Sequence, residues 1–204
     1  MEAHGEDAPL EPEEAARAAW YGVLSRLLYA PPESDLLESL SAAESEGEHA
    51  EAGSFVEAWG ALQRACGAAD PEAVREEYET LFVSVGRAPV TPYTSAYAAP
   101  HGPERHLVAL RTRLGSWGLT RHDRVFEAED HIAALCDAMR WLIVRGHDLE
   151  EQRGFFDEYI ARAAPAFCDA INRAPDAVFY RAVSQFLRAY VRLEQDAFDM
   201  HTPS

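Results

Sequence analysis

Four residues that could bind a cation or a basic group fall within five consecutive positions of the sequence: Glu127, Glu129, Asp130 and His131. Acids at the start of a helix interact favourably with the helix dipole, so this cluster could be no more than a helix cap. Alternatively, Glu127 and His131 are spaced i, i+4 and would share one helix face as half of a metal site. In a third interpretation, the carboxylates bind guanidinium groups through paired, charge-assisted hydrogen bonds.

A second group of candidate residues lies in the stretch from Gly86 to Pro103, which is rich in proline and glycine. Because the residue before a proline is disfavoured in the helical conformation, we expect an irregular loop here. Tyr93 and Tyr97 give this loop large apolar faces with polar tips, which suit contact with a bound peptide. The same two rings could equally well close one end of a helical bundle by ordinary packing.

Enzymatic chemistry has little support in these residues. Ser95 is not part of a G-x-S-x-G motif, and the adjacent Asp130 and His131 would have to point in different directions to form a catalytic relay with it. All 18 basic residues are arginine, which excludes lysine nucleophiles and the lysine of a phosphate-binding loop. The sequence contains no H-E-x-x-H or D-x-D-x-D pattern to complete a metal site. We therefore expect binding and not catalysis, without a metal.

Composition and charge narrow the class of protein further. The chain has 204 residues, of which 48% are hydrophobic and 26% charged, as is typical of one folded domain. Its formal net charge of −17 would repel the backbone of a nucleic acid. Residues 1–63 hold 14 of the 35 acids but only two arginines. We expect this run of acids to form a solvated face, although a basic partner would also suit it.

Cysteine use and hydropathy indicate a cytoplasmic protein. Cys66, Cys136 and Cys168 form neither a C-x-x-C motif nor an even-numbered disulfide framework, so we expect buried thiols. The first residues are acidic where a secretory leader would be basic. No apolar run approaches the ~20 residues of a membrane span, so we expect no membrane insertion.

Apolar residues recur at steps of three and four along almost the whole chain, which predicts an all-α, single-domain bundle of about eight helices. Asp70 followed by Pro71 is typical of a helix start, and Pro165 should kink or split a long helix. The expected helices begin near residues 13, 34, 54, 71, 104, 127, 149 and 176. We divide the chain into a flexible acidic N-terminus (1–12), the helical domain (13–198) and a tail (199–204), with a mobile loop at 44–53.

Three short motifs, in this order and spacing, resemble one protein family. They are Tyr78-Glu79-Thr80-Leu81-Phe82, then Pro92-Tyr93-Thr94-Ser95-Ala96-Tyr97, then Glu127-Ala128-Glu129-Asp130-His131. With Gly118-Leu119 and Phe179-Tyr180, the set is similar to the pattern of the TorD/DmsD family of redox-enzyme maturation chaperones, which is related to the NarJ type. The resemblance covers about residues 15 to 195.

Three positions depart from the family pattern. Thr91 stands in place of the usual first proline of the loop motif, Ala96 in place of a valine, and Ala128 in place of the proline of the E-P-x-D-H motif. The missing proline frees φ at that position, so the start of the following helix should be less rigid than is usual in the family.

The resemblance implies an all-helical cytoplasmic chaperone, and not an enzyme. Such a protein binds the twin-arginine leader of a molybdopterin-containing oxidoreductase and assists cofactor insertion before Tat export. Glu127, Glu129 and Asp130 would pair with the arginines of the leader. His131 would orient Asp130 or contact the peptide backbone.

The resemblance also implies an apolar contact with the leader, in which a hydrophobic stretch of the peptide lies in a groove beside the acids. Aromatic and neighbouring side chains of the first two motifs would make that contact. These residues are Tyr78, Phe82, Pro92, Tyr93, Ser95 and Tyr97.

Several features stay open at this point. No cofactor is implied, although weak nucleotide binding has been suggested for the family. The chain could be a monomer or a homodimer that exchanges helices, with the prolines at 89–92 as a hinge. Two other hypotheses remain, namely a metal-dependent hydrolase that uses Glu127 and His131, and a structural oligomerisation module.

Overall fold

The computed structural model describes residues 10–43, 54–83, 88–119 and 128–201, and every structural statement below concerns these ranges. Within them, all named elements are helices. The strand-like pairing among these residues is an isolated antiparallel bridge between Tyr93 and His131. The prediction of an all-α fold is confirmed.

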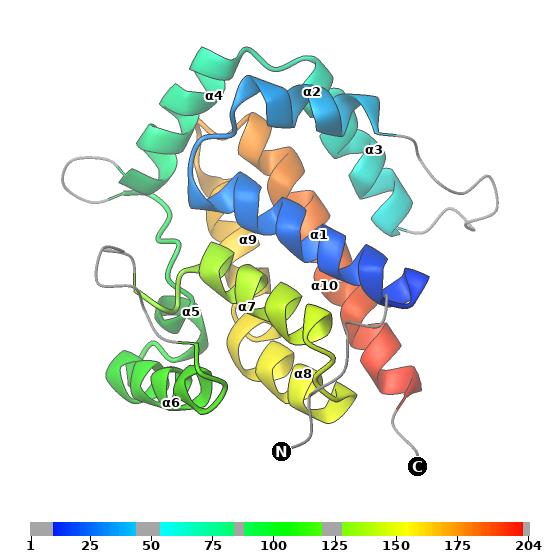
Figure 1. The fold of residues 1–204 in the computed structure, drawn as a ribbon. Helices are drawn as coiled ribbons and strands as arrows, with labels where there is room; N and C mark the ends of the chain where they lie inside the picture. Colours follow the sequence, from blue (N-terminus) through cyan, green and yellow to red (C-terminus); the bar gives the residue numbers. More distant parts are fainter. Residues whose placement is uncertain (1–9, 44–53, 84–87, 120–127, 202–204) are drawn as a thin grey trace.

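The helices follow the predicted order along the chain (Figure 1). In sequence they are α1 (Pro12–Tyr29), α2 (Ser34–Ala42), α3 (Ser54–Gly67), α4 (Pro71–Tyr78), η1 (Glu79–Val83), α5 (Ser95–Ala98), α6 (Pro103–Ser116), α7 (Ile132–Val144), α8 (Leu149–Phe155), η2 (Phe156–Ala161), α9 (Ala164–Arg173) and α10 (Phe179–Met200). The elements η1 and η2 are π-helical turns that continue α4 and α8, and such turns are often found near functional sites.

Local residue chemistry accounts for most of the helix ends. Asp70 accepts a hydrogen bond from the Glu72 amide at 3.1 Å, and Pro71 occupies the first turn of α4. The last turns of α6 and α7 are followed by Gly118 and Gly146, whose φ angles of 76° and 67° are strained for other residues.

Two boundary predictions were wrong and one was confirmed. The stretch 86–103 is not irregular throughout, because the short helix α5 lies within it. The helix that we expected from about Glu127 begins five residues later, at Ile132, because His131 has an extended backbone and caps the helix. Pro165 does divide the predicted long helix, since it lies in the first turn of α9.

The body of the molecule is built around α1, α7 and α10. Figure 1 shows α1 and α7 running side by side, with α10 behind α1, while α6 lies at the periphery. The crossing of α1 and α7 is close at Gly22, where an added Cβ would lie 3.3 Å from Cδ of Arg140. Small residues at such crossings allow two helix backbones to approach.

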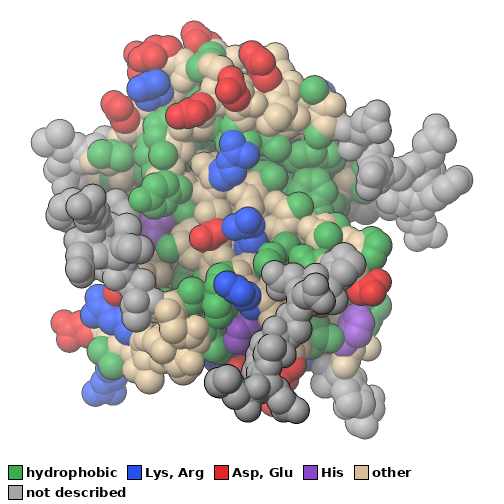
Figure 2. Space-filling model, in the orientation of Figure 1, with side chains coloured by type: hydrophobic (Ala, Val, Ile, Leu, Met, Phe, Trp, Pro, Cys, Tyr) green, Lys and Arg blue, Asp and Glu red, His purple; other side chains and the backbone are tan. Residues whose placement is uncertain are grey.

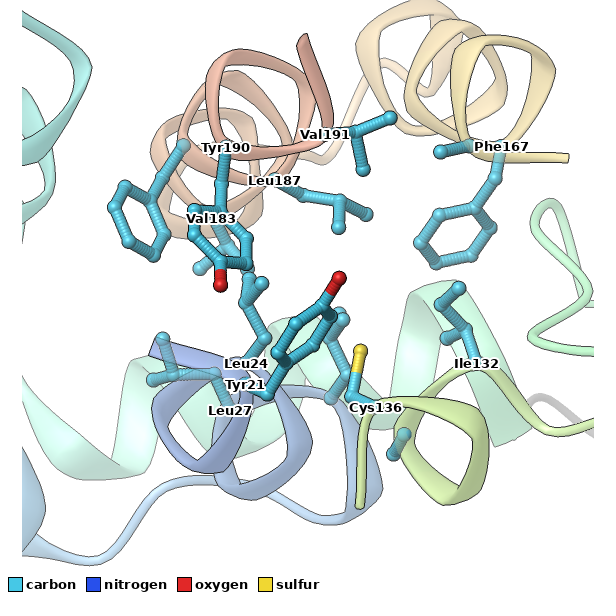
Figure 3. Close-up of a cluster of buried hydrophobic side chains, with 14 of the residues drawn as sticks. Tyr21, Leu24, Leu27, Ile132, Cys136, Phe167, Val183, Leu187, Tyr190 and Val191 are labelled. Atoms are coloured by element: carbon cyan, nitrogen blue, oxygen red, sulfur yellow. The ribbon is translucent and has the colours of Figure 1, made fainter. Parts of the chain in front are cut away.

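The core is formed by apolar side chains that α1, α7, α9 and α10 direct toward one another (Figure 3). Burial of such side chains contributes about 1.5–3 kcal/mol each. The labelled members of this cluster are Tyr21, Leu24, Leu27, Ile132, Cys136, Phe167, Val183, Leu187, Tyr190 and Val191.

The cysteines are inert structural residues. Cys66, Cys136 and Cys168 are free thiols and all three are buried, as the sequence predicts. Burial raises the pKa of the Cys66 thiol to about 11 and the pKa of the other two to about 12. Because the thiolate is the reactive form, these side chains are protected from oxidation and alkylation.

One buried ion pair joins the two ends of the fold. Glu194 of α10 is only 2% exposed and receives hydrogen bonds from Arg17 of α1 through Nε (2.8 Å) and Nη2 (2.9 Å). The Tyr21 hydroxyl donates a third hydrogen bond to the same carboxylate at 3.0 Å. Burial by itself lowers the pKa of Arg17, but the bonds to Glu194 outweigh it and raise the pKa above its ordinary value.

A second long-range contact holds the start of α10. The carboxylate of Glu77 on α4 accepts hydrogen bonds from the backbone amides of Val178, Phe179 and Tyr180, at 2.8, 2.9 and 2.8 Å. Free amides at a helix start need such acceptors, and a carboxylate also complements the helix dipole. The contact fixes α4, and the η1 turn that follows it, against the body.

The surface carries its acids unevenly. Figure 2 shows acidic side chains gathered over α2 and α4, with arginines nearer the middle of the same face. Asp35 and Glu38, which belong to the acidic run at 1–63, are exposed as expected of a solvated face, and Glu72 and Glu76 of α4 are exposed as well. None of the described helices is both long enough and apolar enough to span a membrane.

We predict that Glu194→Ala lowers the free energy of unfolding by about 3 kcal/mol, because Arg17 would be left without its carboxylate in a largely buried position. Urea denaturation measures this change. Asp137→Ala is the control, since the pair of Asp137 with Arg140 is exposed and should contribute less than about 1 kcal/mol. Equal losses in the two variants would contradict the structural role of the buried pair.

Candidate functional site

The predicted loop and the start of α7 lie side by side. The amide of Thr94 donates to the carbonyl of Asp130 at 2.9 Å, and the amide of Ile132 donates to the carbonyl of Pro92 at 2.9 Å. These two bonds make the antiparallel pairing of Tyr93 with His131, which we call the loop–helix bridge. Two motifs that are far apart in the sequence are thereby fixed against each other.

Asp130 is the side chain that completes the loop–helix bridge. Asp130 is 2% exposed, and its Oδ2 accepts a hydrogen bond from the amide of Ser95 at 3.2 Å. The carboxylate thus binds a backbone donor at the start of α5, in the position of a helix cap. This bond ties the start of α5 to the segment that precedes α7.

His131 is also used by the fold. Its Nδ1 accepts the amide of Ala133 at 3.2 Å, which caps α7 and requires that this nitrogen carry no proton. The imidazole is 2% exposed and lies in edge contact with Tyr93, with ring centroids 5.7 Å apart. The ring of Tyr29 makes a similar contact at 6.1 Å.

Tyr29 is a residue of this surface that the sequence analysis missed. It is the last residue of α1 and is 52% exposed, and its ring makes a T-shaped contact with the ring of His131. In the sequence it is an ordinary aromatic residue at a helix end. Only the packing of α1 against α7 brings it to the site.

Of the two predicted acids that the structure describes, Glu129 is more exposed than Asp130. Its side chain is 16% exposed, and Oε2 accepts a hydrogen bond from Nη2 of Arg111 on α6 at 3.0 Å. This bond raises the pKa of Arg111. Arg111 is a second residue that the sequence analysis missed, because its pairing with Glu129 depends on how α6 folds back.

Tyr97 is half-buried and joins two parts of the loop through its hydroxyl. Its hydroxyl donates to the carbonyl of Thr91 at 2.8 Å, and its ring packs at 5.9 Å against Phe167 of α9. Burial raises the pKa of Tyr97. Pro92, Tyr93 and Ser95 are likewise neither fully buried nor fully exposed.

Tyr78 and Phe82 lie behind this surface, in the core. The Tyr78 hydroxyl donates to the carbonyl of Tyr29 at 2.7 Å, and the two buried rings of the motif lie 5.1 Å apart. Phe82 also packs against Phe167, the ring that supports Tyr97. The structure places these two residues as supports of the loop, so direct contact with a peptide is not their evident role.

Of the proposed half metal site, Glu127 lies outside the described residues. Its other member, His131, is the N-cap of α7 and has an extended backbone, so it does not lie on a helix face. Among the described residues, no group of three or more His, Cys, Asp or Glu side chains could hold a metal ion.

Two described pockets lie elsewhere on the molecule. One, of about 250 Å³, lies between α3 and α10 beside Ser54 and Arg192. The other, of about 320 Å³, lies near the first turn of α1 and the start of α8, beside Glu13 and Leu149. Neither pocket is lined by a residue of the predicted site.

Comparison with known proteins places the chain in a family. The model of the family described as "Nitrate reductase delta subunit" matches residues 48–169, which include all three motifs. The chain belongs to this family. The match confirms the resemblance to TorD and NarJ-type proteins that the motifs indicated.

Two known proteins are similar to the chain. Chaperone protein TorD of Ferrimonas balearica is 30% identical over 129 residues, which cover 58% of this chain and 56% of the relative. The alignment therefore spans little more than half the length of that relative. A solved structure from Archaeoglobus fulgidus, described as a candidate redox enzyme maturation protein, is 17% identical with a TM-score of 0.53. It covers 95% of this chain and 99% of its own, and shows a shared fold.

We predict that Asp130→Ala lowers the free energy of unfolding by about 1–3 kcal/mol, because the amide of Ser95 would lose its acceptor in a buried position. Thermal or urea denaturation measures the loss. Glu129→Gln, which removes the charge of the preceding residue, should leave stability nearly unchanged, because the Arg111 side of its ion pair is 49% exposed and such pairs contribute little. If the two variants unfold alike, Asp130 does not hold the loop.

Proposed function

We propose that this chain is a cytoplasmic maturation chaperone, and not an enzyme, for a molybdopterin-containing oxidoreductase. It would bind the twin-arginine leader of that protein and guard it until the cofactor is inserted, before Tat export. The family match and the name of the similar chaperone from Ferrimonas balearica support this proposal. Binding through carboxylates and aromatic rings needs no cofactor.

The observation that carries the proposal is the meeting of the loop motif and the acidic motif at one surface. The loop–helix bridge sets Tyr93 beside His131, Tyr29 completes the aromatic cluster, and Glu129 lies one residue before Asp130. Exposed aromatic faces next to carboxylates suit a peptide that carries both arginines and an apolar stretch. In the alternative interpretation the acids only cap a helix and the tyrosines only pack against the bundle. That interpretation does not account for the exposure of Tyr29.

The acids would have different roles in binding the leader. Glu129, at the surface, would receive a guanidinium group, and Glu127 is proposed as the second receptor although it lies outside the described residues. Asp130 would position the loop and contribute its charge, since its carboxylate is already bound to the Ser95 amide. His131 would orient the rings of Tyr93 and Tyr29.

The remaining predicted residues would act at the apolar part of the leader. Tyr93 and Tyr97 keep partly exposed faces, and Pro92 and Ser95 frame them in the loop. Tyr78 and Phe82 would support these residues from the core. The net charge of −17 would speed the approach of a cationic peptide and make association sensitive to salt.

Titration calorimetry tests the proposal with a synthetic peptide in which an Arg-Arg pair precedes an apolar stretch. We expect saturable binding that weakens about tenfold in Glu129→Gln or Tyr93→Ala, since one charge-assisted bond or one aromatic contact is lost. Glu38→Gln is the control, because it removes an equal charge from exposed α2. A wild-type protein that does not bind the peptide, or an equal effect of Glu38→Gln, would contradict the proposal.

A further inference from the structure

The guanidinium of Arg111 already occupies the carboxylate that the proposed function assigns to the leader. Its Nη2 lies 3.0 Å from Oε2 of Glu129. The Arg111 side chain is 49% exposed, so the pair can be reached from solvent on the arginine side. The chemical group in this contact is the same one that a twin-arginine peptide would present.

The helix that carries Arg111 is attached to the body by few buried side chains. Of the 14 residues of α6, only His106 and Leu110 are buried. Figure 1 shows α6 at the edge of the molecule, beside α5. At the far end of α6, Trp117 donates to Glu151 of α8 at 3.3 Å, which ties that end of the helix to the body. Arg111 lies between these anchors on an exposed position of the helix.

We propose that Arg111 acts as an internal competitor of the leader, occupying Glu129 until an incoming guanidinium replaces it. This inference rests on the proposed function. The exchange replaces one ion pair by another of the same kind, so an arginine of the leader gains less at Glu129 than it would at an unoccupied carboxylate. The contact therefore lowers the affinity for any peptide whose arginine binds Glu129. A peptide with two arginines and an apolar stretch has more additional contacts to offset this loss.

The strength of the contact sets the size of the effect. Accessible ion pairs are weak because water screens them and both side chains lose freedom. Arg111 can therefore be displaced without unfolding α6. Its removal should strengthen leader binding by about two- to fivefold, which corresponds to the usual range for such pairs.

The chain offers a closely matched control on the same helix. Arg105 of α6 is exposed and has no hydrogen-bond or ion-pair partner among the described residues. Arg105→Ala and Arg111→Ala remove the same charge from the same helix, so their general effect on a cationic peptide should be alike. Any excess in Arg111→Ala reports the loss of competition at Glu129.

Calorimetry with the synthetic Arg-Arg peptide, and with the same peptide reduced to one arginine, tests the inference. We expect Arg111→Ala to bind both peptides more tightly than Arg105→Ala does, by a similar factor, because either peptide must displace Arg111 from Glu129. In the Glu129→Gln background the gain should vanish, because the contested carboxylate is gone. Thermal denaturation of each variant verifies that it is folded.

The outcomes separate this inference from the function on which it rests. If the wild type binds the Arg-Arg peptide but Arg111→Ala binds no better than Arg105→Ala, the competitor role is wrong and the chaperone proposal stands. A gain that persists in the Glu129→Gln background also overturns the competitor role. If no variant binds either peptide, both proposals fail together.

Discussion

The loop–helix bridge is the constraint on which the candidate site depends. Two backbone hydrogen bonds join Thr94 to Asp130 and Ile132 to Pro92, and the buried carboxylate of Asp130 adds a third bond to the Ser95 amide. Burial makes these bonds costly to break, because each freed donor or acceptor would lack a partner. A loop rich in proline thereby gains one conformation, and its tyrosines stay beside the acids at the start of α7.

Hydrogen bonds elsewhere in the fold hold the loop–helix bridge in place. The amide of Val90 donates to the carbonyl of Leu81 in the η1 turn, so the loop starts from a fixed point. Glu77 of α4, the helix that leads into η1, accepts hydrogen bonds from three backbone amides at the start of α10. These bonds hold α4 and α10 together. The site is thus part of the same packed body as the core, while Tyr29 and the side chain of Arg111 are about half exposed and the side chain of Glu129 is 16% exposed.

The features that depend on residues close together in the sequence were predicted from it. Prolines, the Asp70 cap and apolar spacing gave the helices, and the ordered motifs gave the family. The start of α7 was missed because acids at 127–130 resemble a first helical turn, whereas Asp130 binds a distant amide and His131 serves as the cap. Tyr29 and Arg111 could not be found from the sequence, since only tertiary packing brings α1 and α6 to these acids.

Hydrogen–deuterium exchange with and without a synthetic Arg-Arg peptide tests the central claim most directly, because it reports each backbone segment of the intact chain. The account predicts slower exchange on peptide addition in residues 88–98 and 128–133, which contain the two sides of the loop–helix bridge, and at the end of α1. Slower exchange confined to the pocket between α3 and α10, with no change at the bridge, would contradict it.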